Sequence, residues 1–166
     1  MAPKYGTFKE YLADNYEGPF MATDILIRYN DGEKDGLVLI ERKYPPYGLA
    51  LPGGIAEKIT LSDNAIKEAK EETGLDIVVD VPTYRPLCVL SNPNQDPRAF
   101  IASATYTAQG YGILKPHQDE DAKWAKVFTL DEIAKMLPQQ EIWAFPIHHR
   151  QILEIYLASV GYDGRK

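Results

Sequence analysis

Three glutamates lie close together near the end of a predicted helix. Glu68 and Glu72 are four residues apart, and Glu71 lies between them. On a helix, positions i and i+4 share one face and position i+3 is adjacent. Like charges at this spacing destabilise an isolated helix, and the negative end of the helix dipole adds to that effect. The cluster therefore calls for a compensating cation, unless it is a solvated charged face neutralised by the lysines beside it.

A pair of glycines precedes this helix and favours the first interpretation. Gly53 and Gly54 follow Leu51-Pro52, and Glu57 comes three residues later. Two consecutive glycines allow a turn that brings backbone carbonyl groups close to a ligand. Mg²⁺ takes oxygen ligands and is commonly held by one or two carboxylates together with substrate phosphates. The loop and the helix together predict a divalent-metal site for a phosphorylated ligand.

The elements that must position these residues form a mixed pattern. Apolar spacing predicts a helix over 61–73, which Thr60 or Ser62 can cap and which Gly74 ends. A hairpin is predicted from strands at 20–29 and 37–42. The remaining predictions are an N-terminal arm over 1–19, strands at 49–51, 77–79, 87–90, 99–107 and 126–130, a helix at 130–136 and a C-terminal helix within 144–160. Because strands and helices do not alternate strictly, we expect an α/β (α+β) domain with a mixed β-sheet.

Size and composition restrict the class of protein. The 166 residues fit one domain over 1–166, and 18 basic against 24 acidic residues give a net charge of −6. An acidic domain is a poor candidate for non-specific nucleic-acid binding. No apolar stretch is long enough for a membrane span, and no secretory segment is evident at the N-terminus. Because Cys88 is the single cysteine, we expect no disulfide framework and a cytoplasmic location.

The loop and the helix resemble the signature of the Nudix hydrolase family. That signature runs Gly, five residues, Glu, seven residues, Arg-Glu, an apolar residue, any residue, Glu-Glu, any residue, Gly and an apolar residue. Glu68 matches the first helical acid, and Glu71 and Glu72 match the acidic pair before Gly74. The segment from Leu51 to Glu57 is similar to the opening loop. The resemblance implies an α/β/α sandwich around a mixed sheet.

The chain departs from the signature at two positions. The spaced glutamate would fall on Ile59 or Thr60, and the arginine is Lys67. In the family these two residues are thought to form a salt bridge that supports the loop–helix geometry. Because both are replaced, we expect the pair to be lost without leaving an unpaired charge.

The resemblance also implies a reaction and a set of residues. Water would attack a phosphorus of a diphosphate, with Mg²⁺ or Mn²⁺ neutralising the charge. The implied metal ligands are Glu68, Glu71, Glu72 and Gly53, and the implied catalytic residues are Glu71, Glu72 and Glu120. Glu120 belongs to an acidic run at 119–121, for which a solvated loop is the alternative interpretation.

A second segment bears on the substrate. Asp96-Pro97-Arg98 is similar to a loop of ADP-ribose pyrophosphatase-like Nudix proteins, and a guanidinium suits a diphosphate. The alternative is that Arg98 forms a salt bridge with Asp96. Arg42, Gly54 and Glu57 complete the predicted substrate-binding set.

The remaining aromatic and histidine residues give weaker signals. Phe20, Tyr44 and Tyr47 could stack on a base, although core or dimer contacts are more common for aromatics. His148 and His149 lie on the predicted last helix, and we expect them to be structural or exposed rather than ligands.

The expected activity follows from the resemblance. We expect hydrolysis of ADP-ribose or another ADP-sugar to AMP and a sugar phosphate. The alternatives are a hydrolase of a damaged nucleoside triphosphate or a dinucleotide, and a non-catalytic nucleotide-binding Nudix domain. The predicted partners are a small-molecule nucleotide and a second copy in a homodimer, with no nucleic acid and no membrane.

Overall fold

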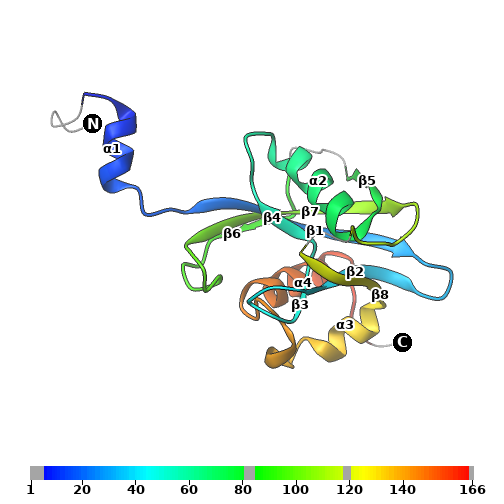
Figure 1. Cartoon of the computed structure of the whole chain (residues 1–166). Coiled ribbons are helices and arrows are strands. Elements are labelled where there is room, and N and C mark those ends of the chain that lie inside the picture. The colour runs from blue at the N-terminus through cyan, green and yellow to red at the C-terminus, as the bar shows by residue number, and fades with distance from the viewer. Residues whose placement is uncertain (1–5, 81–84, 118–120, 165–166) are drawn as a thin grey trace.

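A mixed β-sheet lies between helices on both of its faces (Figure 1). The computed structural model describes residues 6–80, 85–117 and 121–164. Helix α2 (Leu61–Thr73) covers one face of the sheet, and helices α3 (Leu130–Met136) and α4 (His148–Ser159) cover the other. The predicted α/β/α sandwich is confirmed.

The sheet is built around two long parallel strands. The strands are β1 (Phe20–Asn30), β2 (Asp35–Arg42), β3 (Leu49–Ala50), β4 (Gly53–Ile55), β5 (Asp76–Val79), β6 (Cys88–Leu90), β7 (Ile101–Tyr111) and β8 (Ala122–Phe128). The main path runs β3-β2-β1-β7-β5; β4 pairs with β1, β6 with β7 and β8 with β2. Only β1 and β7 pair in parallel among these strands, and the other pairings are antiparallel.

Strand β1 contributes to the cores on both faces of the sheet. Ile25 and Ile27 pack into the core beneath α2, whereas Leu26 packs into the core beneath α4. The two isoleucines and the leucine are fully buried. A strand covered on both faces is apolar at successive positions, because its side chains alternate between the two cores.

Helix α2 begins and ends where its sequence predicts. The Thr60 side chain accepts a hydrogen bond from the Asp63 N–H, and Gly74 adopts a left-handed conformation with φ of 77°. Ala65 and Ala69 are fully buried against the sheet. The same register brings the glutamate side of the helix to the Gly53–Gly54 loop, as described below.

Several element boundaries differ from the predictions. Strand β8 spans Ala122–Phe128 rather than 126–130, and β4 forms at Gly53–Ile55, where a turn was expected. Strand β7 continues to Tyr111 rather than ending at residue 107, because it pairs with β1 as far as Gln109 and with β5 beyond that point. The last helix begins at His148, not at residue 144, and it ends at Ser159. Pro146 explains the later start, since the residue before a proline disfavours the helical conformation.

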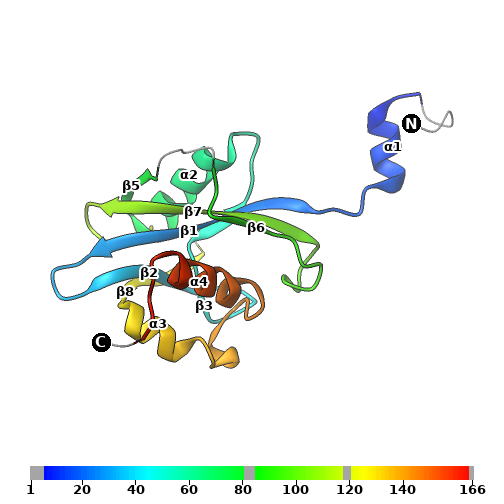
Figure 2. The ribbon, with the colours of Figure 1, turned by 180° about the vertical axis from the view of Figure 1, so that it is seen from behind.

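The arm ahead of β1 contains a short helix, α1 (Phe8–Asn15), that stands away from the sandwich (Figure 2). Thr7 and Glu10 form a capping box at its N-terminus, and none of its residues is buried. In the described part of the chain, no helix combines the length and the apolar character of a membrane span.

Candidate active site

The glycine loop lies directly against the glutamates of α2. The Gly53 N–H donates a 2.8 Å hydrogen bond to Oε2 of Glu72, whose side chain is buried. A Cβ added to Gly54 would lie 2.6 Å from Cδ of Glu68, so any larger residue here would displace the Glu68 carboxylate. The two glycines therefore bring the loop backbone and two predicted metal ligands together.

Burial changes the acid–base behaviour of Glu72. Loss of solvation raises its pKa to about 8; the hydrogen bond from Gly53 opposes this rise, and the charge of Glu68 adds to it. A buried carboxylate in this state lacks a positive partner strong enough to keep it ionised at neutral pH. A divalent cation would provide that charge, so the donor set fits the predicted metal.

A lysine joins the loop to the helix, which corrects one expectation. Lys67 Nζ lies 3.0 Å from Oε1 of Glu57 and 2.9 Å from Oε2 of Glu71. The expectation that the family's loop–helix salt bridge is lost is therefore wrong, because Glu57 supplies the acid from a different position. These contacts raise the pKa of Lys67 well above its usual value, mainly through its hydrogen bonds to Glu71 and Glu57.

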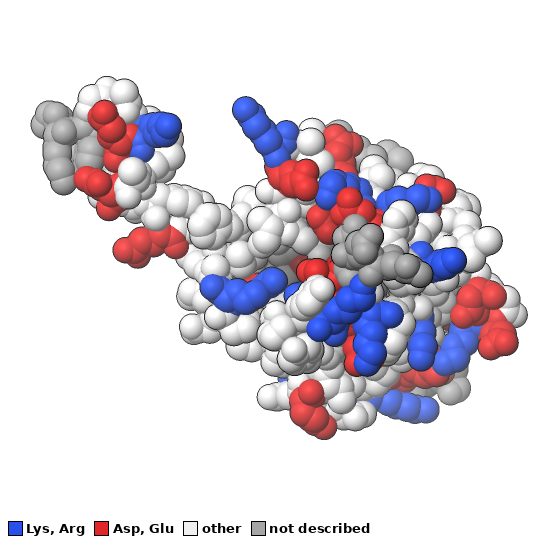
Figure 3. Space-filling view, viewed as in Figure 1, with Lys and Arg blue, Asp and Glu red and all other residues white. Residues whose placement is uncertain are grey.

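Red and blue side chains alternate over the face that carries α2, rather than forming one extended acidic patch (Figure 3). Lys67 also lies 3.9 Å from Glu68, and Lys70 pairs with Asp76 at 2.9 Å. The solvated-face interpretation therefore accounts for Glu71, whose carboxylate Lys67 holds. It does not account for Glu72, which is only 3% exposed.

A cleft of about 130 Å³ opens beside the glycine loop. Arg42 and Arg98 both project into it and stack over the ring of Phe145, at 5.4 and 5.2 Å from the ring centre. Arg98 also forms a bidentate ion pair with Asp96, at 3.0 and 2.8 Å. The salt bridge named as the alternative is therefore present, and it holds the guanidinium at the edge of the cleft.

The structure brings some of the predicted site residues together and separates others. The same cleft is lined by Arg42, Arg98, Gly53 and Gly54. Glu72 lies behind it and accepts a hydrogen bond from the Gly53 N–H. Glu57 points to Lys67 instead of the cleft. Glu120 lies outside the described residues, next to Asp121, which lines the cleft and lies 3.9 Å from Arg42.

The aromatic candidates do not line this cleft. Tyr44 and Tyr47 are 57% and 67% exposed. Phe20 lines a neighbouring, almost wholly apolar groove, whose other lining residues are Ile55, Arg98, Ala99 and Ile101. Arg98 is thus shared between the cleft and the groove.

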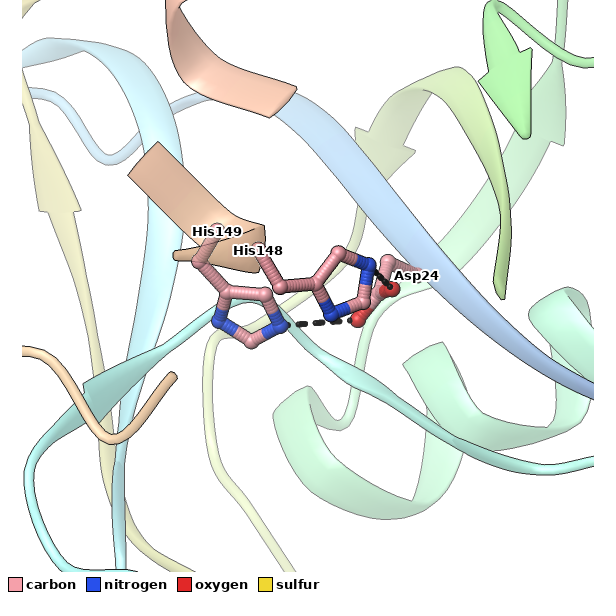
Figure 4. Close-up of side chains that lie close together, drawn as sticks. All are labelled: Asp24, His148 and His149. Atoms are coloured by element: carbon pink, nitrogen blue, oxygen red, sulfur yellow. Dashed lines mark hydrogen bonds and ion pairs between the residues drawn. The ribbon is translucent and has the colours of Figure 1, made fainter. Parts of the chain in front are cut away.

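The sequence analysis missed a buried cluster at the base of the cleft. Asp24 accepts from His149, whose Nε2 lies 3.0 Å from Oδ1, and His148 Nε2 lies 3.2 Å from Oδ2 (Figure 4). The three residues are all buried and offer ligand atoms within 4.8 Å of one another. A charged residue, Asp24, next to the apolar run Ile25-Leu26-Ile27 of a predicted strand is the sequence signal that could have identified it.

The close approach at Gly54 predicts the effect of adding one methyl group. Gly54→Ala should displace the Glu68 carboxylate and raise the Mn²⁺ concentration needed for half-maximal activity by about tenfold, the effect typical of disturbing a metal's surroundings. Gly6→Ala is the matched control, because its Cβ would lie 3.3 Å from the carboxylate of Glu10, on the N-terminal arm and away from the glycine loop. Equal metal requirements in the two variants would contradict the prediction.

Comparison with known proteins identifies the family. A family model described as the NUDIX domain matches residues 19–151. This span includes the glycine loop, α2 and both arginines of the cleft. The chain belongs to the Nudix family. No curated protein sequence matches it.

Solved structures share the fold at low sequence identity. The Nudix domain of Shewanella oneidensis NrtR, complexed with ADP ribose, is 21% identical with a TM-score of 0.69, over 93% of this chain and 99% of that one. An ADP-ribose pyrophosphatase from Streptococcus suis is 20% identical with a TM-score of 0.63, over 86% and 92% of the two chains. A bifunctional NMN adenylyltransferase/ADP ribose pyrophosphatase from Francisella tularensis, complexed with AMP and a manganese ion, is 23% identical with a TM-score of 0.64, over 91% of this chain and 44% of that one.

Proposed function

We propose that this Nudix protein is a metal-dependent hydrolase that cleaves the diphosphate of ADP-ribose or another ADP-sugar. The observation that carries the proposal is the buried Glu72 carboxylate behind the glycine loop, next to a cleft with two guanidinium groups. The carboxylate needs a cation, and the two guanidinium groups can bind phosphate oxygens. Together they suit a phosphorylated ligand that binds with a metal ion.

The carboxylates of α2 are the proposed metal ligands. Glu68, Glu71 and Glu72, with the carbonyl of Gly53, would hold Mg²⁺ or Mn²⁺, since hard cations take oxygen ligands. When bound, the cation neutralises charge on the phosphates and lowers the pKa of an attacking water. The loop contributes orientation, because Gly53 fixes one oxygen of Glu72 and leaves the other for coordination.

The other residues act on the substrate and on the water. Arg42 and Arg98 bind the diphosphate oxygens, and Phe145 keeps both guanidinium planes in place. Glu71, held by Lys67, orients or deprotonates the attacking water, and Glu72 or Glu120 could share that role. Water then adds to one phosphorus while the bond from that phosphorus to the bridging oxygen breaks, which gives AMP and a sugar phosphate.

The apolar groove beside the cleft supports the proposal that the substrate is a nucleotide, because it offers a place for the base. Phe20 and Ile55 offer apolar surface next to Arg98, so a base could pack there while its diphosphate reaches the arginines. The similar structures from Shewanella oneidensis and Francisella tularensis were solved with ADP ribose and with AMP, respectively. Both observations favour an adenosine diphosphate derivative over an inorganic substrate.

A substrate panel tests the proposed activity. ADP-ribose, other ADP-sugars, dinucleotides and damaged nucleoside triphosphates are incubated with Mg²⁺ or Mn²⁺, and the products are identified by mass spectrometry. We expect AMP and ribose 5-phosphate from ADP-ribose. Turnover confined to triphosphates would overturn the substrate, and ligand binding without turnover of any compound would overturn the enzyme.

The arginine at the edge of the cleft predicts a defect in substrate binding. Arg98→Met should raise KM for ADP-ribose by about 10- to 100-fold, because a hydrogen bond to a charged group contributes about 1.5–3 kcal/mol. Steady-state kinetics measure this change. Arg85→Met removes an equal charge from an exposed position outside the cleft and serves as the control. A KM for Arg98→Met equal to that of the control would contradict the proposed role.

We further propose that the chain forms a homodimer in the cytoplasm. Phe8 and Tyr16 in the arm that stands away from the sandwich (Figure 2), and Phe20 at the start of β1, are about half exposed. Apolar side chains exposed together favour a protein contact over solvent. Light scattering after gel filtration tests the dimer, and a monomer mass at micromolar concentration would overturn it.

A further inference from the structure

Two adjacent histidines at the start of α4 meet one buried aspartate of β1. His149 Nε2 lies 3.0 Å from Oδ1 of Asp24, and the Ser103 hydroxyl donates to Oδ2 (Figure 4). His148 Nε2 lies 3.2 Å from Oδ2 without a hydrogen bond among the described residues. Asp24 is therefore held by partners from β7 and α4, and His149 is the one that reaches the glycine loop.

The second ring nitrogen of His149 fixes its tautomer. The Leu51 N–H donates a 3.1 Å hydrogen bond to Nδ1 of His149, so this nitrogen carries a lone pair. Burial lowers the pKa of His149, against the charge of Asp24, which favours the neutral imidazole. Its proton is then on Nε2 and is donated to Asp24.

This tautomer argues against a metal centre at the three residues. Coordination by His149 Nε2 would move the ring proton to Nδ1, where it would face the Leu51 N–H. A metal-bound histidine normally donates its other ring N–H to a carboxylate, a carbonyl or water. The opposite arrangement here indicates that His149 links Asp24 to Leu51 by hydrogen bonds instead of binding a cation. We call this linkage the brace.

The brace holds the loop that carries the proposed metal ligand. Leu51 is bound to His149, the Pro52 carbonyl accepts from the Ile25 N–H at 2.9 Å, and Gly53 pairs with Asp24 in the sheet. The Gly53 N–H then donates to Glu72. Three successive residues of the loop are thus fixed to α4, to β1 and to α2.

We propose that His149 is a positioning residue, which holds the Leu51–Gly54 loop through its Nδ1 acceptor and thereby orients Glu72 for the cation. The inference rests on the proposed metal site, although the brace itself is defined by the contacts of His149 alone. It assigns a role in the metal site to the start of α4, far along the chain from the glutamates.

A matched pair of amides separates the two functions of the imidazole. His149→Asn keeps an acceptor near Nδ1 but loses the donor to Asp24, whereas His149→Gln keeps a donor near Nε2 but loses the acceptor for Leu51. Hydrogen exchange of the 51–54 segment reports on the loop without any metal. Mn²⁺ binding followed by electron paramagnetic resonance reports on the metal site without turnover.

We expect His149→Gln to speed exchange at Leu51 and to raise the Kd for Mn²⁺ by about tenfold or more, as for other residues that orient metal ligands. His149→Asn should retain both wild-type values, and thermal unfolding shows that each variant is folded. Equal behaviour of the two variants would overturn the proposal, as would faster exchange in His149→Gln with an unchanged Mn²⁺ Kd.

Two further samples keep the hypotheses apart. If His148→Ala binds one Mn²⁺ fewer than the wild type, the three residues form a metal site and the brace is wrong. If Glu72→Gln and the wild type bind Mn²⁺ equally, the proposed metal site fails, whereas the exchange of Leu51 still decides whether His149 holds the loop.

Discussion

Glu72→Gln should lower the rate of metal-dependent ADP-ribose hydrolysis by at least about 100-fold, more than the loss of a residue that only orients a metal ligand. The amide keeps the size of the side chain but removes the charge that a cation requires. Glutamine can also still accept the hydrogen bond from the Gly53 N–H, so the loop should stay in place. The loss should appear in kcat at saturating Mg²⁺ or Mn²⁺, with AMP release as the measurement.

A control on another helix shows whether the loss belongs to the site. Glu154 is exposed on α4 and outside the cleft, so Glu154→Gln removes one charge without touching the loop. We expect wild-type kcat for this variant. A similar, small reduction in both variants would show that Glu72 is not a metal ligand.

Local spacing was sufficient to predict the helix and its glutamates. Thr60 and Gly74 bound the helix, and the i, i+4 relation of Glu68 and Glu72 follows from its geometry alone. The glycine pair also lies within 20 residues of these acids, so the loop–helix contact was accessible to sequence reasoning. What the spacing did not predict is the depth of Glu72, because burial depends on how the helix rotates over the sheet.

The salt bridge of Lys67 shows a limit of matching a signature position by position. Glu57 lies two residues before the nearest expected position, yet its side chain reaches the same lysine at 3.0 Å. Long side chains on a loop allow one ion pair to form from several backbone positions. A signature records the usual position, whereas the physical requirement is only that opposite charges meet.

The cleft could not be predicted because its residues come from distant parts of the chain. Arg42 ends β2, Arg98 precedes β7, and Phe145 lies between β8 and α4. Asp24 and His149 meet only because β1 lies at the centre of the sheet and α4 packs against it. No periodicity in the sequence reports on contacts of this kind, and the charge of Asp24 next to an apolar run was their only trace.

Glu72 also predicts how the stability of the metal-free protein depends on pH. Burial raises its pKa to about 8 from an ordinary value of 4.5, so between these values the folded state keeps a proton that the unfolded state has released. Stability must therefore fall as pH rises through this window, by at most about 1.4 kcal/mol per pH unit from this one group. Above about pH 8 the carboxyl is ionised in both states, so the contribution of Glu72 to stability no longer changes with pH.

Glu72→Gln isolates this contribution, because the amide does not titrate. Urea unfolding with EDTA, at several pH values between about 5 and 8, gives the difference in unfolding free energy between wild type and variant. As pH rises, the unfolding free energy of the wild type should fall relative to that of Glu72→Gln. Saturating Mn²⁺ should reverse this fall, because the cation replaces the proton and binds only the folded site. A difference that stays constant with pH would mean that Glu72 is ionised without a cation. The carboxylate would then have another positive partner, and its burial could no longer be explained by a metal site.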